Sequence, residues 1–219
     1  MSEVYAMKNS RLLVLGAALA LTVAAFAVPA SAATLAVTNG AAIDGSFGMG
    51  VTFDPMTTTR AYVEDATPNA ETHYVFRYRF DPNDVIMDNN KRYKQFTAFR
   101  ETPTQYRGIN VTYRKGDGNG TNFYRVKSHM NESSAVWQTS DWITIPEGPS
   151  VLEVDWTRSS GPGAADGVMR VWLDGVLVST VSNLDNDEVN VDFVRWGAVG
   201  GVDLNTDGTQ FFDLFESFR

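Results

Sequence analysis

The sequence contains no cysteine and only two histidines. The absence of cysteine excludes disulfide bonds, thiol chemistry and zinc sites built on Cys ligands. Motifs rich in histidine, which would indicate a metal centre, are missing as well. No stretch has the apolar period of an amphipathic helix. The formal net charge of -8 argues against nucleic acid and anionic membranes as partners, because both are bound mainly through Lys and Arg.

The N-terminal segment has the layout of an export signal. Lys8 and Arg11 form a short basic region, residues 12–28 are uninterrupted apolar sequence, and a small-residue cleavage site ends at Ala32. The apolar run is shorter than the roughly 20 residues that span a bilayer. We therefore predict a cleaved signal peptide over residues 1–32, no membrane insertion after cleavage, and a secreted or cell-surface protein.

Met7 also has the position of an initiator, which would make residues 1–6 an upstream extension. The remainder, residues 33–219, is about 185 residues long, a size that suits one domain with a substantial core. Without disulfides, that domain must be stabilised by burial of apolar side chains, with or without a bound ion.

The mature sequence consists of short segments with alternating polarity. From His73 to Phe80, aromatic residues occupy every second position, which is the period of a β-strand. Asp174-Gly175, between two alternating runs, is the dipeptide that a two-residue type I′ hairpin prefers. About ten or eleven such segments, separated by Gly-, Pro- and Asp-rich turns, predict an all-β, antiparallel two-sheet sandwich. They include 47–53, 60–64, 94–101, 108–115, 122–129, 135–145, 151–157, 189–199 and 209–218.

Three segments carry a resemblance to a known family: Asp166–Gly175, Val194–Ala198 and Phe211–Ser217. They resemble the closing strands of concanavalin A-like lectin/glucanase jelly rolls, in particular the laminin-G-like modules of secreted bacterial proteins. The resemblance implies two curved antiparallel sheets with adjacent terminal strands, and a frequent role in carbohydrate binding. Because this sandwich supports lectins, glycosidases, lyases and adhesion modules alike, the fold does not by itself define the function.

Glycosidases of this fold commonly use a Glu-x-Asp-x-x-Glu strand, which places acidic side chains on one face as nucleophile and acid. Glu153 and Asp155 match the first two positions, but Arg158 replaces the second Glu. A lyase would need a His or Tyr base beside a cation or amide, and no motif surrounds either His73 or His129. These observations favour a protein that is not an enzyme.

The loop that contains Asp203, Asn205 and Asp207 matches the opening of an oxygen-rich calcium loop. Leu214 stands where an EF-hand would have its Glu, so the match is partial. The alternative is a polar hairpin loop in which Asp and Asn bond their own backbone. Calcium is therefore a candidate cofactor, at this loop or at a neighbouring acidic cluster formed by Asp185, Asp187 and Glu188.

Alternation also suggests a binding face. If the aromatic residues of the segment from His73 to Phe80 point to the core, Arg77 and Arg79 point outward. The same rule sends five further residues to an exposed sheet face: Arg114, Arg125, Lys127, Arg170 and Trp172. An indole that stacks on a sugar ring and Arg side chains that bind carboxylate or sulfate would suit an acidic polysaccharide. In the alternative interpretation, these cations pair with Glu153 and Asp155 across strands.

Together these features predict a secreted, non-catalytic, lectin-like module that binds extracellular glycan. One alternative is a structural or adhesive module whose surface binds a protein or further copies of itself. A second alternative is a divergent glycoside hydrolase or polysaccharide lyase.

Overall fold

The computed structural model describes residues 33–219 except 102, 117–120 and 132–135. The described residues lie in one compact unit, Ser31–Arg219, and contain fourteen strands in two antiparallel sheets. The predicted signal peptide and the choice of initiator lie outside the described residues. Among the residues described, no helix has the length and apolar character needed to span a membrane.

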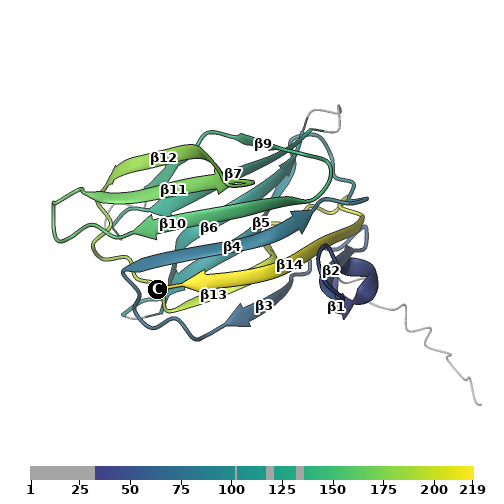
Figure 1. Ribbon diagram of the computed structural model, residues 1–219, viewed down its shortest axis with the longest axis horizontal. Helices are drawn as coiled ribbons and strands as arrows, with labels where there is room; N and C mark the ends of the chain where they lie inside the picture. Colours follow the sequence, from purple (N-terminus) through teal and green to yellow (C-terminus); the bar gives the residue numbers. More distant parts are fainter. Residues whose placement is uncertain (1–32, 102, 117–120, 132–135) are drawn as a thin grey trace, which may run out of the picture. The chain divides into compact units, whose positions relative to one another are not determined.

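Sheet A contains seven strands, and Figure 1 shows its members β4, β10 and β14 in front of β5 and β6 of the other sheet. In spatial order its strands are β1 (Thr34–Thr38), β2 (Gly48–Phe53), β14 (Gly208–Phe218), β4 (His73–Asp81), β10 (Ser150–Thr157), β11 (Gly167–Leu173) and β12 (Val176–Leu184).

Sheet B forms the second layer. Its spatial order is β3 (Ala61–Asp65), β13 (Phe193–Gly200), β5 (Arg92–Arg100), β6 (Tyr106–Lys115), β7 (Asn122–His129) and β8 (Trp137–Thr139), and β9 (Ile143–Ile145) also pairs with β7. The all-β two-sheet sandwich predicted from the alternation is confirmed. The strand predicted as the first, β2, pairs with the last strand, β14, whereas β1 lies on the other side of β2.

The core between the sheets is aromatic. On β4, Tyr74, Phe76, Tyr78 and Phe80 are all fully buried, as their period-two spacing predicted. Phe76 stacks on Phe96 of sheet B with 3.8 Å between ring centroids. Large buried rings of this kind contribute most of the apolar burial that stabilises a domain without disulfides.

The turn at Asp174-Gly175 has the predicted geometry. Both residues have positive φ, 50° and 78°, as a type I′ hairpin requires. The Asp174 carboxylate also accepts a hydrogen bond from the Val151 amide at 2.8 Å, which ties the hairpin to β10.

Three strand predictions are corrected by the structure. β1 was not foreseen, and the segment 189–199 becomes a strand only at Phe193. The segment 135–145 is divided into β8 and β9, because the Ser140 hydroxyl takes the place of a backbone acceptor for the Val126 amide, at 3.0 Å. Polar side chains that bond to the backbone interrupt a strand in this way.

Candidate functional site

The predicted binding residues Arg77, Arg170 and Trp172 lie on the outer face of sheet A, on β4 and β11. Arg125 does not share that face. It belongs to β7, in sheet B, so the prediction of one common face is wrong for this residue. Alternation along each strand correctly separated core from surface, but alternation does not reveal which sheet a strand joins.

Carboxylates neutralise the outer face of sheet A. The Arg77 Nε donates to Glu216, and this hydrogen bond raises the pKa of the guanidinium. Asp155 lies 2.8 Å from His73 Nε2 and 3.7 Å from an Arg170 nitrogen. Cross-strand pairing therefore uses the charges of this face, as the alternative interpretation of the sequence proposed.

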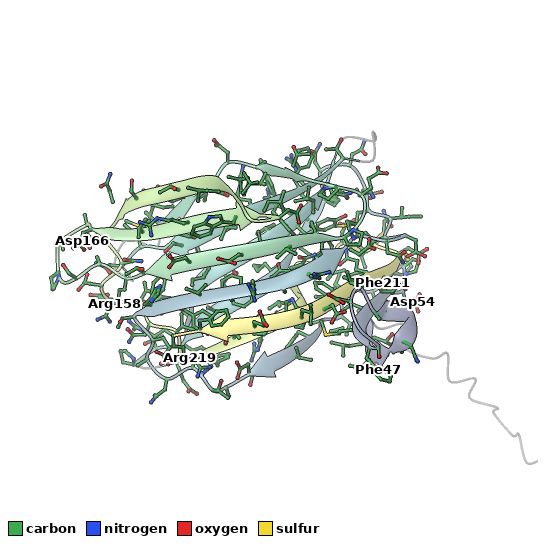
Figure 2. The ribbon with its side chains drawn as sticks, in the orientation of Figure 1. Phe47, Asp54, Arg158, Asp166, Phe211 and Arg219 are labelled. Carbon is green, nitrogen blue, oxygen red and sulfur yellow. The ribbon has the colours of Figure 1, made fainter. Side chains whose placement is uncertain are left out.

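The residues of the incomplete glycosidase pattern belong to the same region. Glu153 lies opposite Arg77 and Trp172 in the strand register, whereas Asp155 contacts His73 and Arg170. Arg158, at the end of β10 in Figure 2, donates to the Asn190 side chain at 2.5 Å. These contacts assign Asp155 to cross-strand pairing, and the register places Glu153 next to Arg77.

The candidate calcium residues make separate contacts. Asp203 pairs with Lys91 at 3.0 Å, Asn205 donates to Asp88 at 2.7 Å, and Asp207 accepts from the Gly208 amide at 2.7 Å. The second cluster is bridged by Asn131, which donates to Asp185 and Asp187. Within the part of the chain that the structure describes, no group of three or more His, Asp or Glu side chains could hold a metal ion.

The outer face of sheet B is different, because it concentrates cations with few acidic partners. Its strands and flanking residues carry Arg60, Arg92, Lys94, Arg107, Arg114, Arg125, Lys127 and Arg195. Across the residues described, Arg195–Glu64, at 2.8 Å, is the only ion pair that any of these cations forms. Sheet B thus presents a basic surface on a protein whose net charge is -8.

A hollow of about 750 Å³ opens on this face, which we call the main cavity. Its lining includes Lys94, Tyr106, Arg107, His129 and Arg195. These side chains come from the three consecutive strands β5, β6 and β7 and from β13, which is distant in sequence but lies next to β5 in the sheet. Cations, aromatic rings and polar groups therefore meet in one hollow.

Aromatic rings hold the cavity's cations and its imidazole in place. Phe99 and Phe193 stack with their centroids 4.6 Å apart, and the Arg195 guanidinium lies 4.9 Å from the centroid of Phe99. The His129 ring lies 5.0 Å from that of Tyr106 and 4.9 Å from that of Trp137. Such packing limits the rotamers of the polar groups and preorganises the cavity.

Two lysines of this surface are electrostatically unusual. Burial, followed by the charges of Arg107, Arg60, Lys127 and Arg92, lowers the pKa of Lys94. Burial and three arginines act on Lys127 in the same direction. Like charges are therefore held together at a cost in free energy, and an anion placed among them would relieve that cost.

Comparisons with known proteins bear on the fold. No model of a protein family matches the sequence, and no curated protein matches it. Solved structures do match. The endo-β-1,4-glucuronan lyase from the fungus Trichoderma reesei has a TM-score of 0.59 and 12% identity, over 84% of this chain and 86% of that one.

Two further structures are similar to the same extent. Alginate lyase Aly36B has a TM-score of 0.55 and 12% identity, over 84% of this chain and 86% of that chain. The cellulose induced protein Cip1 has a TM-score of 0.56 and 16% identity, over 85% and 86%. The chain therefore has the two-sheet jelly-roll fold of these proteins. Identities this low show the fold alone.

Of this basic surface, the sequence predicted Arg114, Arg125 and Lys127 to be exposed, but it gave no indication of the residues that line the main cavity. No motif surrounds His129 in the sequence, but the sheet places its ring against Tyr106 and in the same cavity as Arg107. The signal that could have found it is the alternation of Arg125, Lys127 and His129 along β7, which puts all three on one face.

Proposed function

We propose that this protein is an exported module that binds an acidic polysaccharide on the outer face of sheet B. The observation that carries the proposal is the set of cations around the main cavity, which have one carboxylate partner among the residues described although the protein is acidic overall. Cations kept apart from the protein's own carboxylates are available for those of a ligand.

The chemistry of the cavity suits uronate residues. Arg107 offers a planar donor fork that matches a carboxylate, and Arg195, whose Nε donates to Glu64, adds a second positive charge. Tyr106 and Trp137 offer ring faces for the C–H face of a sugar. Two of the similar structures are named as lyases of glucuronan and alginate, which are polymers of uronic acids. Their names support this class of ligand for the cavity.

Affinity electrophoresis or calorimetry with alginate, polyglucuronate and a neutral glucan tests the proposal. We expect both polyuronates to bind and the neutral glucan not to bind. Replacing Arg107 and Arg195 with Gln should weaken polyuronate binding, whereas Arg77→Gln with Arg170→Gln on sheet A serves as the matched control. Binding should also weaken as salt rises, because exposed charges are screened over about 8 Å near physiological ionic strength. Equal binding of neutral glucan would contradict the proposal.

A second candidate function is β-elimination, and one observation favours it. Lys94, Tyr106 and His129, which can exchange protons, line the same cavity as Arg107. In such a reaction a base removes the proton from C5 of a uronate, and a C4=C5 double bond forms as the C4–O bond breaks. An acid then protonates the leaving oxygen, while a cation stabilises the charge that develops on the carboxylate.

The ultraviolet absorbance of the unsaturated uronate product distinguishes catalysis from binding. A lyase should produce this absorbance with alginate or polyglucuronate, and His129→Ala or Lys94→Ala should lower the rate while the protein still binds the polymer. Absence of product with polymers that do bind would leave the non-catalytic module as the function.

A further inference from the structure

The basic surface extends beyond the main cavity. A second hollow of about 330 Å³ is lined by Arg92, Lys94, Thr112, Lys127 and Gly201 among others. Lys94 and Gly201 line both hollows. Gly201 has φ of 79°, and a Cβ at this position would lie 3.6 Å from the Lys94 Nζ. The absence of a side chain there leaves the ammonium open to both hollows.

The two hollows belong to a continuous path of cations across sheet B, and the strand register shows its direction. Lys94 on β5 pairs with Thr112 on β6, which in turn pairs with Arg125 on β7. In the next row, Arg92 pairs with Arg114. The small Thr112 side chain therefore separates cations on both sides, and the cationic path crosses from β5 to β7.

The path ends at Trp142, between β8 and β9. The guanidinium carbons of Arg114 and Arg125 both lie 4.1 Å from the centroid of the Trp142 ring. Burial and the neighbouring charges of Arg114 and Arg92 lower the pKa of Arg125, and only Asp141 acts in the opposite direction. The Nε atoms of Arg114 and Arg125 are buried and have no hydrogen-bond partner among the residues described. The indole thus holds two like charges together.

The opposite end of the main cavity is acidic. A neighbouring hollow, which shares Gln105 and Arg195 with it, is lined by Glu64, Glu101 and Asp192. A polyanion that occupies the main cavity is therefore repelled at that end and attracted toward Trp142.

We propose that Arg114, Arg125 and Trp142 form a second anion subsite, so that the ligand is a linear polyanion whose successive charged sugars contact both the main cavity and this subsite. The proposal rests on the proposed function. Arg125 and His129 are four residues apart on β7, about 13 Å along the strand, a span that a single sugar ring does not bridge. The protein therefore selects its ligand by chain length.

Calorimetry with purified alginate di-, tetra- and hexasaccharides tests this selection. The wild-type protein should bind the hexasaccharide about tenfold more tightly than the disaccharide, the factor that one added charge-assisted contact supplies. Arg114→Gln with Arg125→Gln should remove that gain and leave disaccharide affinity unchanged. Arg107→Gln with Arg195→Gln should weaken binding at every length, and Arg77→Gln should change none of the affinities.

Trp142 acts through the two arginines, so it is a positioning residue. Trp142→Leu should reduce the gain from chain length, whereas Trp142→Phe, which keeps a ring face, should restore most of it. Each variant is compared only after its thermal unfolding matches that of the wild type, and Arg125→Lys provides a milder replacement if the double variant unfolds.

The outcomes separate the two proposals. If hexasaccharide affinity is unchanged in the Arg114/Arg125 variant but falls in the Arg107/Arg195 variant, the second subsite is wrong and the main cavity stands. The same conclusion follows if all lengths bind equally to the wild type. If the wild type binds none of the three, both proposals are overturned.

Discussion

The two outer faces of this sandwich carry similar residues and differ in how their charges are balanced. On sheet A, Arg77 and Arg170 lie beside Glu216 and Asp155. Sheet B has further cations beside Lys94, Lys127 and Arg125. Burial is the main cause that lowers the pKa values of these three residues, and the neighbouring cations lower them further. The first arrangement stabilises a sheet modestly, whereas the second costs stability unless an anion lies among the cations.

The largest expected effect comes from reversing charge on each face. Arg107→Glu with Arg195→Glu should weaken polyuronate binding by at least about 100-fold, because it replaces attraction by repulsion in the main cavity. Arg77→Glu with Arg170→Glu makes the same change in net charge on sheet A and should alter binding by less than about twofold. Comparable losses from the two pairs, measured by calorimetry, would show that overall charge controls binding and that the faces are equivalent.

Substitutions in the Asp174-Gly175 hairpin of sheet A should change the stability of the fold and leave binding unchanged. Gly175 has φ of 78°, which a β-branched side chain strongly disfavours even though the space around it is open. Gly175→Val should therefore lower the free energy of unfolding by about 1 to 3 kcal/mol. Asp174→Ala should cost less. Denaturant unfolding measures both effects, and an unchanged midpoint for Gly175→Val would contradict the turn geometry. Polyuronate affinity of the folded variant should stay at the wild-type value.

The hairpin also shows how far the sequence alone leads. Asp174-Gly175 and the aromatic alternation of β4 are local patterns, and both predicted their structures correctly. Strand partners are not local. Arg125 is assigned to sheet B by its pairing with Thr112, a contact that depends on topology rather than on alternation.

The site was harder to predict for the same reason. The main cavity draws Lys94, Arg107, His129 and Arg195 from four strands, and none of these residues has a motif around it in the sequence. The pairing of a cation with a carboxylate is equally non-local, because Glu216, which accepts a hydrogen bond from Arg77, lies more than 130 positions away in the sequence. The alternation of residues along a strand could therefore predict that a cation is exposed, but it could not predict whether that cation has a carboxylate partner.

Removing a cation that lies among other cations should raise the stability of the fold and lower polyuronate affinity. Lys94→Met deletes an ammonium that is disfavoured by burial and by Arg107 and Arg60. We expect the free energy of unfolding to rise by about 1 kcal/mol while polyuronate affinity falls. Lys91→Met is the control, because Lys91 is half exposed and paired with Asp203. A destabilised Lys94→Met variant would contradict the account of sheet B as an electrostatically costly surface.

The lowered pKa values of the two lysines also predict how stability and polyuronate affinity depend on pH. The pKa values of Lys94 and Lys127 are lowered in the folded protein, so their charged forms are destabilising at neutral pH. This cost disappears as the pH rises through the folded pKa values toward the ordinary value of 10.5, and stability should rise accordingly. Polyuronate affinity should fall over the same range. Affinity that is constant from neutral pH up to that value would contradict a role for these lysines.

Calcium should have the smallest effect. Asp203, Asn205 and Asp207 have separate partners in the structure. Thermal unfolding with calcium and with chelator should therefore give the same midpoint. If calcium raises the midpoint, as binding to the folded state alone would require, and Asp203→Ala with Asp207→Ala abolishes the rise, the loop is a calcium site after all.

The most direct test of the difference between the faces is an NMR titration of the isotopically labelled protein with an alginate hexasaccharide. We expect chemical-shift changes in β5, β6, β7 and β13, extending to Trp142, while β4, β10 and β11 remain unchanged. Changes concentrated on β4, β10 and β11, around Arg77 and Trp172, would contradict this expectation and place the binding site on sheet A.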